Sequence, residues 1–103
     1  MVFIYKLIPP RPTFAADQTA DEAAVMARHI AYWTGHYDNG LVAAFGPVAE
    51  PSCAWGMALV ETHSAADVQQ LGRNDPAVTP GLATFEVIPM PMALIRPARA
   101  DHP

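Results

Sequence analysis

The sequence predicts an α+β domain with the ferredoxin-like βαββαβ plait, in which a four-stranded antiparallel sheet carries two helices on one face. Four segments rich in β-branched, aromatic and aliphatic residues alternate with two segments of helical periodicity, in the order strand, helix, strand, strand, helix, strand. The two central strands follow each other closely enough to pair as a hairpin. A chain of 103 residues has room for one domain with a single core.

The first half of the chain predicts one strand and one long helix. Residues 2–8 (VFIYKLI) read as a strand that the proline pair at 9–10 stops, and residues 9–18 read as a loop. Thr19 and Glu22 match a capping box, in which each side chain binds the backbone N–H of the other residue. The helix that begins there has apolar residues at spacings of three and four and ends at Asn39-Gly40.

The second half predicts a hairpin, a short helix and a last strand. Residues 41–45 form a short buried strand closed by Gly46-Pro47, and residues 54–61 form the third strand. Ser64 caps a helix from residue 65 to residues 71–73, and Asp75-Pro76 opens the turn that follows. Residues 82–88 are the fourth strand, and residues 92–95 could add an edge strand. We expect a domain of residues 1–95 and a proline-rich tail of residues 96–103.

The composition predicts a homodimer. Hydrophobic residues make up 51% of the chain and charged residues only 16%, which is apolar for a small domain. In the first strand, Phe3, Tyr5 and Leu7 point to one side of the sheet and Val2, Ile4 and Ile8 to the other, so both faces of the sheet are hydrophobic. Since the two helices cover only one face, we expect a second copy to cover the other.

Other partners and locations are disfavoured. The net charge is −4 and the six Lys and Arg residues are scattered, which argues against nucleic acid as a partner. No run of residues approaches the roughly 18 apolar residues of a membrane span. The single cysteine, Cys53, cannot form an internal disulfide, and the N-terminus lacks a signal-peptide pattern, so we expect a cytoplasmic protein.

His29 and Asp75 are the candidate catalytic residues. His29 lies on the apolar face of the first helix, where an imidazole needs a hydrogen-bond partner, and the turn at Asp75 can lie beside that helix in a plait. An Asp that accepts a proton from one ring nitrogen fixes the tautomer and makes the other nitrogen a general base. The alternative also stands: His29 is a core histidine bonded to a backbone carbonyl, and Asp75 only caps its turn.

The other polar and aromatic residues give weaker indications. His29 and His36 are two helical turns apart, about 10.5 Å, too far to share a metal, so we expect no metal. The chain also lacks a glycine-rich phosphate loop, so we expect no cofactor. Cys53 has no histidine in a recognisable motif with it and reads as a small hydrophobic residue. Tyr32 and Trp33 can line an aromatic pocket or belong to the core, and Arg28 can meet an anionic substrate or lie in solvent.

The chain resembles the YciI-like (YCII-related) family over about its first ninety residues. The matching motifs are residues 28–32 (RHIAY), 40–47 (GLVAAFGP), 75–78 (DPAV), 81–82 (GL) and 85–87 (FEV). The resemblance implies a ferredoxin-like dimeric α+β barrel with His29 and Asp75 in the active site. One class of members removes chloride from a chlorinated hydroxyhydroquinone, which implies a small aromatic or quinone-like ligand. The long first loop and the proline-rich tail depart from the family pattern.

Two functions are compatible with these observations. The first is a cofactor-independent enzyme, of a lyase, isomerase or dehydrochlorinase type, in which His29 and Asp75 perform general acid/base chemistry on a small molecule. The second is a non-catalytic binding or accessory module, also dimeric, that holds the same ligand. In either case we expect the following residues to contact the ligand: Arg28, Tyr32, Trp33, Gly46, Pro47 and Pro76.

Overall fold

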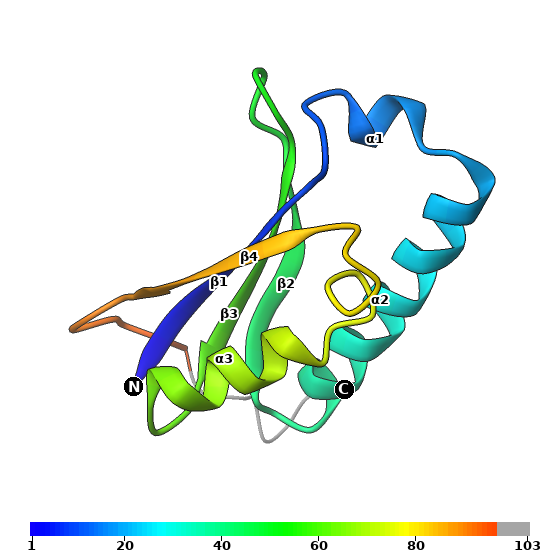
Figure 1. The fold of residues 1–103 in the computed structure, drawn as a ribbon. Coiled ribbons are helices and arrows are strands. Elements are labelled where there is room, and N and C mark those ends of the chain that lie inside the picture. Colours follow the sequence, from blue (N-terminus) through cyan, green and yellow to red (C-terminus); the bar gives the residue numbers. More distant parts are fainter. Residues whose placement is uncertain (97–103) are drawn as a thin grey trace, which may run out of the picture.

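Four strands and three helices make up the fold in a computed structural model that describes residues 1–96. Along the chain these elements are β1 (Val2–Ile8), α1 (Phe14–Asp17), α2 (Ala20–Asp38), β2 (Val42–Val48), β3 (Trp55–Glu61), α3 (Ala65–Arg73) and β4 (Thr84–Pro89) (Figure 1). The predicted βαββαβ order is therefore confirmed, with one short helix added. No helix within residues 1–96 is both long enough and apolar enough to cross a membrane.

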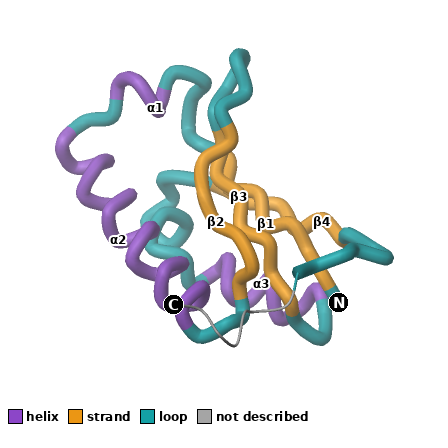
Figure 2. Tube along the Cα trace, turned by 180° about the vertical axis from the view of Figure 1, so that it is seen from behind, coloured by secondary structure: helices purple, strands orange, loops and turns teal. Residues whose placement is uncertain are grey.

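The sheet is antiparallel throughout and has the strand order β2-β3-β1-β4. The central strand β1 pairs with β3 on one side and β4 on the other, so that Tyr5 lies opposite Ala58 and Val87. Figures 1 and 2 show α2 and α3 on the same side of the sheet, with the other side left open. Burial alternates along β1 as predicted, because every second side chain faces the helices.

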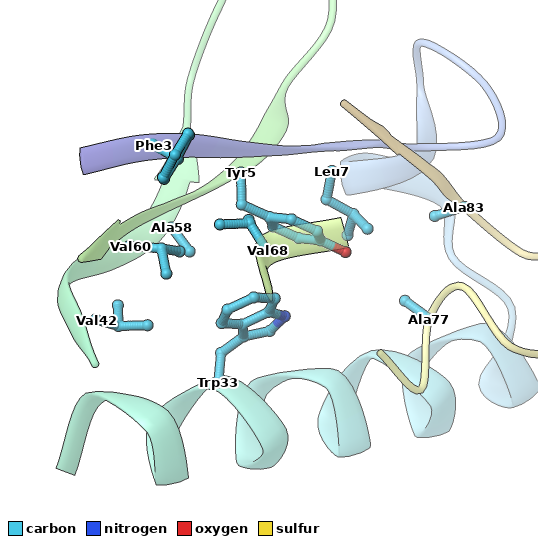
Figure 3. Close-up of a cluster of buried hydrophobic side chains, with 10 residues drawn as sticks. All are labelled: Phe3, Tyr5, Leu7, Trp33, Val42, Ala58, Val60, Val68, Ala77 and Ala83. Carbon is cyan, nitrogen blue, oxygen red and sulfur yellow. The ribbon is translucent and has the colours of Figure 1, made fainter. Parts of the chain in front are cut away.

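The core lies between the sheet and the two longer helices. Trp33 of α2 and Val68 of α3 are fully buried and face inward-pointing side chains of the central strands, namely Phe3, Tyr5, Ala58 and Val60 (Figure 3). The rings of Tyr5 and Trp33 lie 4.5 Å apart between centroids, and the Tyr5 ring stacks on Phe85 at 5.2 Å. These aromatic contacts join β1 to α2 and β4, the elements around the candidate catalytic pair.

Both predicted helix starts are confirmed. The Thr19 side chain accepts a hydrogen bond from the Glu22 backbone N–H, and the Glu22 carboxylate accepts one from the Thr19 backbone N–H. Ser64 accepts from the Asp67 backbone N–H at the start of α3. Both caps use N–H groups that would otherwise have no partner in the first turn.

Three details of the prediction were wrong: the end of the second strand, the added edge strand at residues 92–95 and the loop at residues 9–18. The strand expected to stop before Gly46-Pro47 runs through both residues to Val48, because β2 is an edge strand and tolerates a proline that lacks an N–H. Residues 92–95 add no strand, since Met92 takes a left-handed conformation (φ 58°) after the last backbone bond from Met90 to Val2. Residues 97–103 of the predicted tail lie outside the described residues.

The third error concerns residues 9–18, which were expected to form an irregular loop and instead contain α1. Arg11 fastens this segment to the start of α2: its guanidinium donates to the carboxylate of Asp17 and, through two nitrogens, to that of Glu22. The Thr13 hydroxyl also donates to Asp17 at 2.6 Å. Because Phe14 is buried beneath this network, α1 closes one end of the domain rather than lying loose in solvent.

Candidate active site

Asp75 lies in the turn that follows α3, and its carboxylate caps that turn. Its Oδ1 atom accepts a hydrogen bond from the Ala77 backbone N–H at 2.8 Å, and its backbone carbonyl accepts from Val78 and Thr79. Pro76 directs the chain away from the helix at this point. The capping role suggested by the sequence is therefore present.

The same carboxylate holds His29 of α2. The Nδ1 atom of His29 lies 2.9 Å from both Oδ1 and Oδ2 of Asp75. Oδ2 also accepts hydrogen bonds from the Tyr5 hydroxyl and from the Trp33 indole N–H, each at 2.8 Å. Figure 3 shows the Tyr5 hydroxyl and the Trp33 nitrogen pointing toward the Ala77 side of the core. The capping and orienting roles therefore coexist in one carboxylate.

These contacts keep Asp75 ionised inside the protein. Its side chain is fully buried, which by itself raises the pKa, but the hydrogen bonds from His29, Trp33 and the Ala77 backbone outweigh burial and the pKa is lowered. Burial and the neighbouring charge of Asp75 raise the pKa of the Tyr5 hydroxyl, so that Tyr5 remains a donor. Burial, followed by the charge of Asp75, also raises the pKa of Tyr32.

The His29 ring lines a pocket, and its second nitrogen is not held by Asp75. Because Nδ1 must carry its hydrogen to donate to Asp75, Nε2 carries a free lone pair. Within residues 1–96 Nε2 has no hydrogen-bond partner and is not fully buried, since Nδ1 of His36 is the one buried polar side-chain atom there that lacks a partner. His29 is one of the residues that line a pocket of about 370 Å³ between α1, α2 and the ends of β1, β2 and β3. The other lining residues are mostly apolar, with Phe14, Met26 and Phe45 among the largest.

Two of the six residues predicted to contact the ligand line the pocket, and four do not. Gly46 and Pro47 line it beside His29, at the part of β2 where the strand was expected to end. The other four predicted residues do not line it. The Arg28 side chain is exposed, the Tyr32 hydroxyl donates to the Leu71 carbonyl, Trp33 is buried against Asp75, and Pro76 lies in the turn.

Sequence reasoning missed several of the residues that build this site. Tyr5 reads as an ordinary inward-facing strand residue, and nothing in the strand pattern indicates that its hydroxyl reaches a residue 70 positions away. Phe14, Ala15 and Gln18 line the pocket from a segment that had been taken for an irregular loop. The capping signature at Thr19 together with Arg11 and Asp17 is the signal that could have placed this segment against α2.

The other predicted reactive residues lie apart from the pocket. His36 contacts the rings of Tyr32 and Trp33, and Cys53 is a free, half-buried cysteine in the loop between β2 and β3; neither residue lines the pocket. Within residues 1–96, no group of three or more His, Cys, Asp or Glu side chains is placed to hold a metal ion.

Comparison with known proteins places the chain in a family. No curated protein sequence matches it. A similar solved structure is the 5-chloro-2-hydroxyhydroquinone dehydrochlorinase TftG from Burkholderia phenoliruptrix AC1100, in complex with 2,5-dihydroxybenzoquinone. The two share 17% sequence identity with a TM-score of 0.67, over 87% of this chain and 93% of the other, which is a likeness of fold. The model of the YCII-related domain matches residues 2–91, and the chain therefore belongs to the YCII-related domain family.

Proposed function

We propose that the protein is a small-molecule enzyme in which His29 is a general base and Asp75 its orienting partner. One observation carries the proposal: the buried carboxylate of Asp75 binds Nδ1 of His29, the ring of His29 lines an apolar pocket, and Nε2 has no hydrogen-bond partner among residues 1–96. A histidine that served only the core would have both ring nitrogens bonded or enclosed. We place the enzyme in the cytoplasm.

The chemistry follows from the charge of Asp75. When Nε2 takes a proton from a bound hydroxyl or an acidic C–H group, the imidazolium that forms lies against a carboxylate that is already ionised and hydrogen-bonded. Tyr5 and Trp33 hold that carboxylate without competing for the proton, since both donate to it. The proton can then return to another atom of the intermediate or pass to solvent, so the pair can act as base and then as acid.

We propose a small aromatic or quinone-like substrate. The pocket has the volume for one substituted ring, and Phe14 and Phe45 offer it flat apolar surfaces. The similar structure TftG is described as a dehydrochlorinase of a hydroquinone, which makes elimination of HCl from a chlorinated hydroquinone the first reaction to try. In such an elimination, one hydroxyl proton moves to the chlorine-bearing carbon, a base takes a second hydroxyl proton, and chloride leaves with the C–Cl electron pair. A quinone forms without an external oxidant.

Chloride release tests this proposal. We would incubate wild type, His29→Asn and His63→Gln with a panel of chlorinated di- and trihydroxybenzenes and follow free chloride and quinone absorbance. His63 is an exposed turn residue outside the pocket, so His63→Gln is a matched control for loss of an imidazole. We expect release with wild type and His63→Gln and a loss of about 100-fold or more in His29→Asn. Equal rates in all three proteins would refute a catalytic role for His29.

The apolar pocket also suits the second candidate, a binding module without turnover. In that case wild type and His29→Asn would bind panel members with similar affinity, and neither would convert them. Isothermal titration followed by chromatography of the recovered ligand distinguishes the two functions, because an enzyme returns a changed compound.

We further propose that the protein is a homodimer that buries the open face of the sheet. Ile88 on this face is 40% exposed, and Val2, Ile4 and Leu59 are only partly covered. A sheet face of this character is usually buried against a partner. Light scattering should give twice the monomer mass of 11.1 kDa. Ile88→Glu should weaken the dimer, while Tyr37→Glu, at an exposed aromatic residue of α2, should not. A stable wild-type monomer would overturn the proposal.

A further inference from the structure

We infer that the pocket selects uncharged one-ring ligands and rejects carboxylates and other anions of the same shape. The inference rests on the proposed function, since it concerns the ligand of the same site, and it narrows the substrate class by charge. Its basis is the distribution of charged side chains around the pocket.

The lining offers an anion no counter-charge. Within residues 1–96, no Lys, Arg, Asp or Glu lines the pocket, and its polar side chains are His29, Gln18 and Trp55. The Trp55 indole N–H is already used, because it donates to Glu50. An anion would lose its hydration on entry and gain little in return, which is costly in an apolar site. An uncharged ring with a hydroxyl loses much less and can donate that hydroxyl to Nε2 of His29.

A buried negative charge contacts the His29 ring that lines the pocket. Asp75 lies directly behind the His29 ring, with its carboxylate 2.9 Å from Nδ1. Its field reaches the pocket through a buried region of low polarity, where charges interact more strongly than in water. A ligand anion placed at Nε2 is therefore repelled by Asp75, while a neutral hydroxyl is polarised in the direction that favours proton transfer.

The nearby cations do not cancel this field. Arg11 lies over the Phe14 ring at 5.2 Å, but its guanidinium is engaged by the carboxylates of Asp17 and Glu22. Lys6 lies over the Trp55 ring at 4.8 Å and alternates with the inward-facing Tyr5 and Leu7, so it belongs to the open face of the sheet. Arg11 is therefore neutralised within its own ion pairs, and Lys6 lies on the opposite face of the sheet from α2 and His29.

Volume sets the size of the ligand. A dry cavity of about 150 Å³ holds one benzene molecule, and this pocket has about 370 Å³. One ring with several substituents fits. Within the proposed aromatic and quinone-like class, the inference favours phenols and neutral quinones. It excludes acidic hydroxyquinones that are ionised at neutral pH, including 2,5-dihydroxybenzoquinone.

The test compares probes that differ in one charge. At pH 7, 4-hydroxybenzamide is neutral and 4-hydroxybenzoate is anionic, although the two have nearly the same shape; 4-methylphenol is a neutral, more apolar third probe. We would titrate each into wild type and follow the NMR signals of His29, Phe14 and Phe45. We expect both neutral probes to bind at least tenfold more tightly than 4-hydroxybenzoate. Equal or tighter binding of the carboxylate, or no binding of either neutral probe, would overturn the inference.

A charge-gain variant provides the converse test. Ile30 lines the pocket and is 53% exposed, so a lysine can be accommodated there with its ammonium group at the pocket entrance. Ile30→Lys should bind 4-hydroxybenzoate about tenfold better than wild type, with a much smaller change for 4-hydroxybenzamide. Ala31→Lys adds the same charge to the neighbouring exposed position outside the pocket and is the matched control. If both variants gain equally, charge selection does not arise in the pocket.

The binding results test the inference independently of whether the protein is an enzyme. Selective binding of neutral probes in a protein that turns over no ligand would support the inference and leave a binding module. Turnover that depends on His29, with no preference between neutral and anionic probes, would support the enzyme and refute the inference.

Discussion

Replacing Asp75 by Asn removes one charge and leaves the shape of the side chain unchanged, yet the structure predicts a large loss of stability. Four donors converge on the carboxylate: the side chains of His29, Tyr5 and Trp33 and the backbone N–H of Ala77. An amide has only one oxygen. If its NH₂ group takes the Oδ2 position it meets the indole N–H of Trp33, and if it takes the Oδ1 position it meets the N–H of Ala77.

The magnitude follows from this conflict. One buried N–H without an acceptor costs about 1–3 kcal/mol, and the bonds that remain are no longer made to a charged group. The sum is about 3–5 kcal/mol, a large share of the roughly 5–15 kcal/mol that stabilises a typical domain. A carboxylate that only capped its turn would be replaced by Asn at almost no cost, since the two residues cap about equally well.

Urea unfolding followed by circular dichroism measures this difference. Asp38→Asn, at the exposed end of α2, is the matched control and should change the free energy of unfolding by no more than about 0.5 kcal/mol. A loss below about 1 kcal/mol in Asp75→Asn would show that the convergence of donors on this carboxylate contributes little, and would refute the reasoning.

Three further predictions concern pH, packing and the first loop. The folded-state pKa of Asp75 lies below its usual value, so its contribution to stability is present above about pH 4 and is lost as the pH falls. The difference in unfolding free energy between wild type and Asp75→Asn should therefore become smaller in acid, and a difference that grows would contradict this. Gly72→Ala should lose about 1–3 kcal/mol in urea unfolding, since a Cβ atom there would lie 2.5 Å from the Phe85 ring, whereas Gly35→Ala, where no atom lies within 4 Å, should not destabilise the protein. Arg11→Gln should speed amide hydrogen exchange in α1 with little change in the global unfolding midpoint, and unchanged exchange would show that Arg11 does not fasten α1.

The sequence was sufficient to predict the fold because its signals are local. Alternation in β1, the capping box at Thr19 and the Asn39-Gly40 terminus each depend on residues close together in the chain. How far β2 runs depends on its pairing with β3, which no local pattern reports, and for that reason Pro47 was misread as the end of a strand.

The site was predictable only in part. His29 and Asp75 could be paired because a buried imidazole needs a partner and the plait topology brings the two segments together. Tyr5 and Trp33 could not be assigned to Asp75, since their hydrogen bonds depend on the distances among β1, α2 and the turn after α3. The pocket wall formed by Phe14 depends on the hydrogen bonds of Arg11 that hold α1 against α2. These bonds join side chains outside any periodic sequence pattern, so the pattern could not predict them.

The protonated nitrogen of His29 is the property on which the proposed chemistry depends. Long-range ¹H–¹⁵N spectra of the imidazole rings, recorded at a pH where the ring is neutral and assigned with His29→Asn, identify that nitrogen. Because Nδ1 donates to Asp75, the spectrum should show hydrogen on Nδ1 and an unprotonated Nε2, and a bound phenol should shift the Nε2 signal selectively. A neutral ring with hydrogen on Nε2 would contradict both the role of Asp75 and the assignment of His29 as the base.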